Sequence, residues 1–243
     1  GLLKQNMGNL FRDSLVSILS LGTFMMKKIL IMLVLCPFLT YGQVESFKLD
    51  DAKKVERVKI IYSSDVNNSS VKDLILSLDE VNTNYPALKE ITIYINSGGG
   101  DMFTGQMAAT AIKSSGVPVK TVNAGVVASA ASLLFCAAGK RETFPGSLFI
   151  LHPARVSLSG EYRPDELKNE QVLLEDTETI FKSTYSRCTK YTEAQIDKFL
   201  YSEGTRGNIS AKTAIKFGLV SRMINRMEPS EATYVITDDD KDK

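Results

Sequence analysis

Residues 125–153 read GVVASAASLLFCAAGKRETFPGSLFILHP, and two residues of this segment carry the chemistry expected of the chain. Ser129 lies among very small residues where a helix is expected to begin, and His152, the single histidine of the 243 residues, ends an apolar run. A serine in this setting has an exposed backbone and room for an acyl group beside it. A lone histidine at a strand end is, by itself, more often a structural polar group. Together the two residues predict a serine hydrolase with Ser129 as nucleophile and His152 as its base.

Short β-branched runs alternate with helical patterns on both sides of this segment. Apolar residues recur at every second position in the runs and at every third or fourth position between them. The expected strands cover residues 58–62, 90–96, 119–122, 142–144 and 147–151, and the expected helices begin after 67–70, at 102 and at 129. This alternation predicts an α/β fold with a mostly parallel sheet.

The chain changes character after His152. A polar loop over 155–163 leads to Pro164, and a helix is expected from 165 to about 190. This helix is longer than is typical of globular proteins, so it is either a packed core helix or an arm that docks on another subunit. Shorter helices are expected over 193–200 and 211–217, with a strand over 219–224.

Three glycines, Gly98 to Gly100, follow the expected strand 90–96 directly. They match neither GxGxxG nor GK[ST], so they do not predict a nucleotide site. They fit a strand-to-helix turn, because glycine lets backbone N–H groups face a site without steric cost.

Composition excludes several classes of function. With 29 basic and 28 acidic side chains the net charge is +1, so no general field attracts nucleic acid or anionic lipid. Cys36, Cys136 and Cys188 show no CxxC spacing, and one histidine makes no zinc pattern. We therefore expect no metal and no cofactor. Whether Cys136 and Cys188 are oxidised stays open at this point.

The two ends of the chain are expected to lie outside the folded domain. Residues 25–43 read MMKKILIMLVLCPFLTYGQ, which has the order of a secretory signal peptide with cleavage after Gly42. We therefore expect an exported protein; the alternatives are an uncleaved membrane anchor or a cytoplasmic protein. The expected division is 1–42 upstream extension and signal peptide, 43–56 linker, and 227–243 disordered acidic tail.

Six segments resemble the ClpP-type serine proteases of the ClpP/crotonase superfamily. They are YINSGGG (94–100), GVVASA (125–130), GKR (139–141), FPGS (144–147), ILHP (150–153) and SAKTAIKFGLV (210–220). They occur in the family's order and close to its spacing. The resemblance implies repeated β-β-α units with a long handle helix, in a protease domain over 57–226.

The resemblance also implies roles for individual residues. It places the nucleophile at Ser129, the general base at His152, and the oxyanion-hole N–H donors at Gly99 and Ala130. Phe103 and residues 155–159 become candidates for a groove that binds extended peptide. It further implies a homo-oligomeric ring, with the handle helix joining two rings of subunits into a closed chamber. The implied substrates are peptides or unfolded proteins, with an ATP-driven unfoldase as partner if the protein is cytoplasmic.

Two positions depart from the family's pattern. Gly98 stands where the usual turn has proline, and the position of the family's aspartate, four residues before Ser210, holds Arg206. An arginine cannot accept a hydrogen bond from histidine. Glu203 is the tentative third member of the triad, and the amide of Asn208 is the alternative.

The leading hypothesis is a serine endopeptidase of the ClpP class. The missing aspartate motivates a second one, a catalytically impaired ring or scaffold subunit. A crotonase-type acyl-CoA enzyme is a further alternative, but it would give Ser129 and His152 no catalytic role. A Ser–Lys mechanism would use Lys182 or Lys140 as the base.

Overall fold

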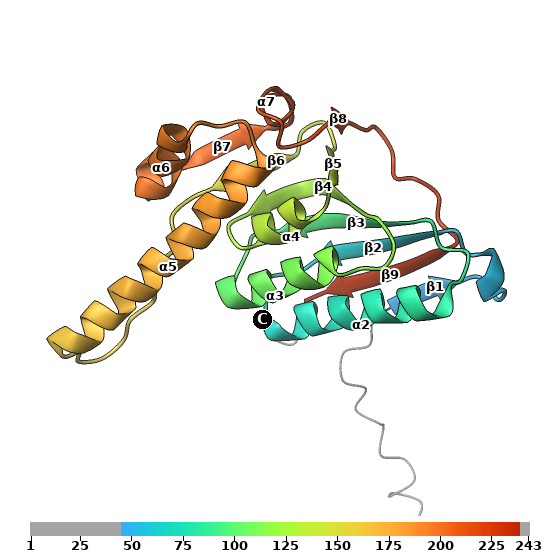
Figure 1. The fold of residues 1–243 in the computed structure, drawn as a ribbon, viewed down its shortest axis with the longest axis horizontal. Helices are drawn as coiled ribbons and strands as arrows, with labels where there is room; N and C mark the ends of the chain where they lie inside the picture. Colours follow the sequence, from blue (N-terminus) through green and yellow to red (C-terminus); the bar gives the residue numbers. More distant parts are fainter. Residues whose placement is uncertain (1–44, 239–243) are drawn as a thin grey trace, which may run out of the picture. The chain divides into compact units, whose positions relative to one another are not determined.

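The computed structural model describes residues 45–238. Within them a sheet runs in the order β1-β9-β2-β3-β4-β5-β8, with β6 paired to β4 and β7 paired to β6 (Figure 1). The strands are β1 (Glu45–Lys48), β2 (Arg57–Ser63), β3 (Glu90–Ser97), β4 (Val119–Ala128), β5 (Lys140–Thr143), β6 (Leu148–Leu151), β7 (Gly207–Ser210), β8 (Arg222–Met223) and β9 (Ala232–Thr237). The helices are α2 (Asn68–Asn84), α3 (Met102–Lys113), α4 (Ala131–Ala137), α5 (Pro164–Cys188), α6 (Glu193–Tyr201) and α7 (Ala211–Lys216), with 3₁₀ turns η1 (Ala52–Lys54) and η2 (Glu203–Thr205).

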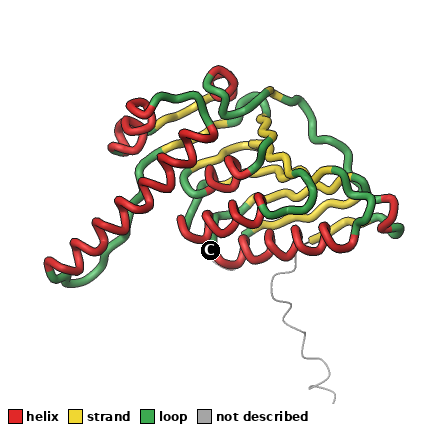
Figure 2. The backbone as a smooth tube through the Cα atoms, in the orientation of Figure 1, coloured by secondary structure: helices red, strands yellow, loops and turns green. Residues whose placement is uncertain are grey.

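The core lies between the sheet and the helices α2, α3 and α4, which cover one face of it (Figure 2). Along β2, alternate residues Val58, Ile60 and Tyr62 are buried, as the period of a strand requires. The helix α2 begins where the sequence predicts, because the side chain of Asn67 accepts a hydrogen bond from the Ser70 N–H and caps the first turn. The α/β fold with a mostly parallel sheet is confirmed.

The strand β4 is shared between two neighbours. Its first half pairs in parallel with β5, and its last three residues, 126–128, pair in parallel with β6. On its other side β4 pairs in parallel with β3, with a register shift between Ile95 and Ser97. Since parallel strands end at the same edge of a sheet, the residues that follow β3, β4 and β6 come together there.

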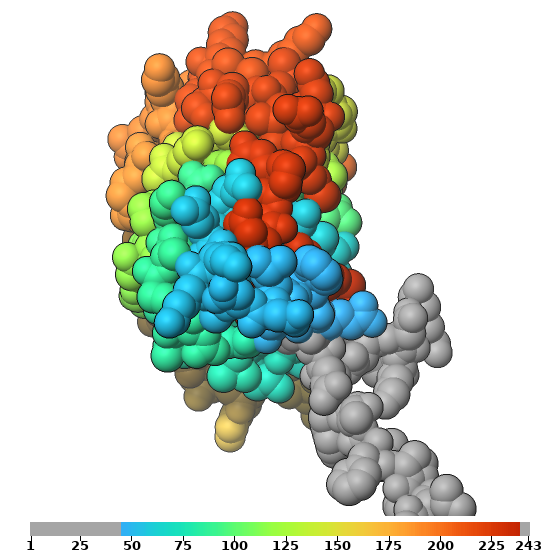
Figure 3. Space-filling view, turned by 90° about the vertical axis from the view of Figure 1, so that its right-hand side faces the viewer, coloured from blue at the N-terminus to red at the C-terminus, as the bar shows by residue number. Residues whose placement is uncertain are grey.

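Residues at both ends of the domain are more ordered than the sequence indicates. Residues 232–237, expected in a disordered tail, form β9, which pairs in parallel with β2 and buries Ala232, Tyr234 and Ile236. Residues 45–48, expected in a linker, form β1, antiparallel to β9. Figure 3 shows these blue and red segments side by side. The assignment of both stretches to linker and tail was wrong, because a long-range pairing orders them. The expected signal peptide and residues 239–243 lie outside the described residues.

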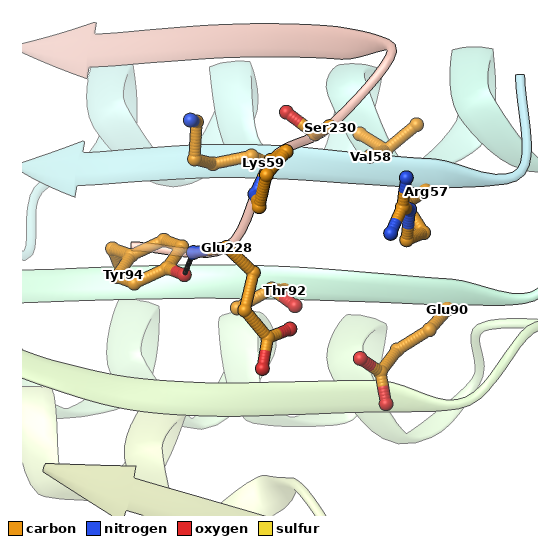
Figure 4. Close-up of a pocket in the computed structure, with 9 residues that line it drawn as sticks. Arg57, Val58, Lys59, Glu90, Thr92, Tyr94, Glu228 and Ser230 are labelled. Carbon is orange, nitrogen blue, oxygen red and sulfur yellow. Dashed lines mark hydrogen bonds between the residues drawn. The ribbon is translucent and has the colours of Figure 1, made fainter. Parts of the chain in front are cut away.

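The segment between β8 and β9 crosses the sheet on its way to that pairing. The N–H of Glu228 donates to the Tyr94 hydroxyl at 2.9 Å (Figure 4). The Glu228 carboxylate accepts from Lys120 Nζ at 2.6 Å, and Lys120, almost fully buried, also contacts Glu90 at 3.0 Å. This ion-pair cluster fastens the segment to β3 and β4. The expected strand over 219–224 is shorter than predicted, since only β8 is extended there.

The structure confirms the packed-helix interpretation for part of the long helix α5. That the rest docks on another subunit stays a prediction. The C-terminal half of α5 packs against the core through Thr177, Phe181, Thr184, Tyr185 and Cys188, whereas none of the residues before Thr177 is buried. A disulfide joins Cys188 to Cys136 on α4, which answers the question left open by the sequence. No helix within residues 45–238 is long and apolar enough to span a membrane.

Candidate active site

Ser129 follows the last residue of β4 and has a strained backbone. Its φ is 51°, and it is the one residue other than glycine with positive φ in the described chain. Its N–H donates to Ile150 O on β6 at 3.1 Å, and its own carbonyl accepts from the Ser132 N–H at 2.9 Å. A backbone held in this way at a strand-to-helix turn is the geometry of a nucleophile elbow.

His152 follows the last residue of β6, one step along the edge from Ser129. The pairing of Ala128 with Ile150 brings the two strand ends together. Both side chains line one cavity of about 450 Å³. No hydrogen bond joins Ser129 to His152 among the described residues; such contacts are often long in unliganded enzymes.

Glu203 lies on the other side of the imidazole. Its Oε2 is 3.3 Å from His152 Nδ1, which leaves Nε2 for Ser129. The reason is topological: β7 is antiparallel to β6 and pairs Gly207 with Leu151, so the residues before β7 lie next to the end of β6. Asn208, the alternative, pairs with Ile150, and no hydrogen bond to His152 is formed from it in the described structure.

Arg206, which occupies the position of the family's aspartate, bonds to the same carboxylate. Its Nη1 lies 2.5 Å from Glu203 Oε1. This hydrogen bond is the main cause that lowers the pKa of Glu203, with smaller contributions from the charges of His152 and Arg155. The carboxylate is therefore kept ionised while it faces the imidazole.

Gly99 and Ala130 both lie next to Ser129. A Cβ added to Gly99, whose φ is 101°, would lie 2.6 Å from Ser129 Cβ and 3.1 Å from Ala130 N, so the glycine is required by close approach. Its N–H donates to Ser97 Oγ at 3.2 Å. No backbone acceptor is found for the Ala130 N–H within residues 45–238. The structure thus brings Gly99, Ser129, Ala130, His152 and Glu203 together.

The chain is similar to known proteins over most of its length. The family model described as Clp protease matches residues 45–227. The chain belongs to this family. The ATP-dependent Clp protease proteolytic subunit of Deinococcus radiodurans is 30% identical over 166 residues, covering 67% of this chain and 76% of the relative. The proteolytic subunit 1 of Corynebacterium diphtheriae is 30% identical over 184 residues, covering 72% and 82%.

A solved structure of a ClpP1 mutant from Listeria monocytogenes has the same fold as this Clp-family chain. Its TM-score is 0.60 at 23% identity, and the match covers 69% of this chain and 91% of the other. The expected ClpP-like α/β fold with its long helix is confirmed.

The cavity beside Ser129 has two walls. One wall holds residues named from the resemblance: Phe103, Arg155, Val156 and Ser157. The sequence did not predict the other wall, to which α5 contributes Leu173, Leu174 and Thr177. Their helical spacing was visible in the sequence, but it does not indicate which element that face meets.

The Ser–Lys mechanism finds no support in this Clp-family site. Lys182 bonds to Asp197 at 2.9 Å, and this bond raises the pKa of Lys182, which makes the amine a poor base. Lys140 contacts Glu90, at the ion-pair cluster around Lys120. The described residues contain no cluster of three or more acidic, histidine or cysteine side chains suited to a metal.

Proposed function

We propose that this chain is a serine endopeptidase of the ClpP type that hydrolyses unfolded or short polypeptides. The observation that carries the proposal is the carboxylate of Glu203, 3.3 Å from His152 Nδ1, with Ser129 at the neighbouring strand end. The family's relatives, described as proteolytic subunits, support it.

The mechanism uses these residues in turn. Ser129 Oγ attacks the peptide carbonyl while His152 Nε2 takes its proton, and Glu203 stabilises the imidazolium that forms. The Ala130 N–H donates to the oxyanion, and the Gly99 N–H joins it by leaving Ser97 Oγ; each donor contributes about 3 kcal/mol. The imidazolium then protonates the leaving amine. Water, deprotonated by His152, hydrolyses the acyl-serine ester and releases the acid.

A fluorophosphonate probe tests the proposal. We expect the wild-type chain to be labelled and to cleave a fluorogenic peptide, and Ser129→Ala to lose both. Ser114→Ala, which changes an exposed serine at the C-terminal end of α3 and outside this cavity, is the control and should keep both. A folded wild-type chain that takes up no label would instead favour the second candidate, an impaired ring or scaffold subunit. The bond of Arg206 to the triad carboxylate is the observation behind that candidate.

We also propose that the protein is exported and assembles as a ring. The disulfide Cys136–Cys188 supports export, because disulfides persist in oxidising compartments. ATP is absent there, so the substrates are short or already unfolded; a cytoplasmic protein would require an ATP-driven unfoldase. N-terminal sequencing of the purified native protein should begin at Gln43. A cytosolic protein with residues 1–42 intact would contradict export.

A further inference from the structure

A chain of three hydrogen-bonding groups connects α5 to the nucleophile. Ser132, the second residue of α4, donates from Oγ to the Ser129 carbonyl at 2.6 Å. The hydroxyl of Tyr185, on α5, lies 2.9 Å from the same Oγ. Because a serine hydroxyl has one proton, and Ser132 uses it on the carbonyl, the Tyr185 hydroxyl must be the donor to Ser132.

Tyr185 is suited to be a permanent donor. Its side chain is fully buried, so water does not compete for the hydroxyl. Burial raises the pKa of Tyr185, which favours the protonated phenol that can donate. Its hydroxyl reaches across to α4, where it meets Ser132.

The carbonyl at the end of this chain belongs to the peptide unit that carries the oxyanion donor. The Ser129 carbonyl and the Ala130 N–H lie on opposite sides of one planar trans peptide. Fixing the carbonyl toward Ser132 therefore fixes the direction of the N–H. Each hydrogen bond in such a chain also polarises the next, which makes the N–H a better donor.

We propose that Tyr185 and Ser132 are positioning residues that aim the Ala130 N–H at the oxyanion and hold the strained backbone of Ser129. This inference rests on the proposed function. The disulfide Cys136–Cys188 fastens the same two helices close to the hydrogen bond: Cys136 follows Ser132 by one turn of α4, and Cys188 follows Tyr185 by nearly one turn of α5.

The test measures kcat and KM for a fluorogenic peptide, together with Tm, in Tyr185→Phe, Ser132→Ala and the double variant. We expect Tyr185→Phe and Ser132→Ala each to lower kcat about tenfold with KM unchanged. If Tyr185 acts through Ser132, adding Tyr185→Phe to Ser132→Ala lowers kcat no further. The matched control is Tyr85→Phe, which removes another buried hydroxyl, 3.2 Å from that of Tyr234; it should lower Tm and leave kcat unchanged.

Each outcome is decisive. Wild-type kcat in Tyr185→Phe, with a loss of Tm like that of Tyr85→Phe, would reduce Tyr185 to a structural residue and overturn the inference alone. Multiplying losses in the double variant would also overturn it, because the two residues would then act separately. A wild-type chain that neither cleaves the peptide nor takes up a fluorophosphonate overturns the proposed function, and the positioning role with it.

Discussion

The carboxylate of Glu203 contacts both His152 and Arg206. One oxygen faces His152 Nδ1, and the other accepts from Arg206. Arg206 weakens the field of the carboxylate at the imidazole, yet it also holds the carboxylate in place and lowers its pKa. The side chain of Glu203 is 61% exposed, so solvent screens its charge more than that of a buried triad acid. We therefore expect a smaller contribution from Glu203 than a buried aspartate makes.

Replacing Glu203 by glutamine measures that contribution. Glu203→Gln keeps the size and removes the charge, so kcat for a peptide should fall about 10- to 100-fold while Tm changes little. Glu193→Gln, at an exposed position on α6, is the control and should leave kcat unchanged. A gain of activity when Arg206→Asp is added to Glu203→Ala would show that the family's position can still hold the acid. An unchanged kcat in Glu203→Gln would show that Glu203 does not contribute to catalysis and that Ser129 and His152 act as a dyad.

Four of the five site residues could be predicted from the sequence, because each belongs to a short motif at the end of a strand. Ser129 and Ala130 follow one strand, His152 another, and Gly99 a third. Glu203 could only be named as a candidate. Its distance from His152 is set by the antiparallel register of β7 on β6. No local sequence pattern specifies which carboxylate this register places next to the histidine.

At the scale of elements, a disulfide fastens α4, the helix after Ser129, to α5. The disulfide between α4 and α5 closes a loop of 52 residues. By the chain-entropy relation, a loop of this length stabilises the fold by about 4 kcal/mol. The sequence could not predict the pairing, since two cysteines so far apart meet only after α5 has packed on α4.

The variant Cys136→Ser with Cys188→Ser tests this link. We expect a free energy of unfolding lower by about 4 kcal/mol in denaturant titrations. A reducing agent should bring the wild-type chain to the stability of the variant and leave the variant unchanged, which is the internal control. Detection of two free thiols in the native, unreduced protein would contradict the expectation.

The pairing of β1 with β9 shows where element prediction fails. Residues 232–237, ATYVIT, are rich in β-branched and aromatic residues, which is a strand signal, but the acidic residues after them favoured a tail. Insertion of β9 between β1 and β2 depends on a partner almost the length of the domain away. Local patterns thus predicted the elements around the site and missed those ordered by the distant end of the chain.

At the scale of the whole domain, α5 exposes apolar side chains that could pack against another molecule. Its N-terminal half extends beyond the sheet and its helices (Figure 1), and it presents Leu167 and Val172, each 47% exposed. Exposed apolar side chains one after another on a projecting helix indicate a surface that another molecule covers. The same helix supplies Leu173 and Leu174 to the wall of the cavity beside Ser129, so the proposed assembly contact and the proposed substrate site share one element.

If the proposed ring assembles through α5, charges on its projecting half should dissociate it. Leu167→Glu with Val172→Glu places two like charges per protomer in the contact, at sites whose exposure makes them harmless to the isolated fold. Light scattering after size exclusion should show a lower molar mass at unchanged circular dichroism. Leu76→Glu, at an even more exposed apolar position on α2, is the control and should keep the wild-type mass. Because Leu173 and Leu174 border the cavity, peptide hydrolysis should fall together with the mass; an unchanged mass would remove α5 from the assembly contact.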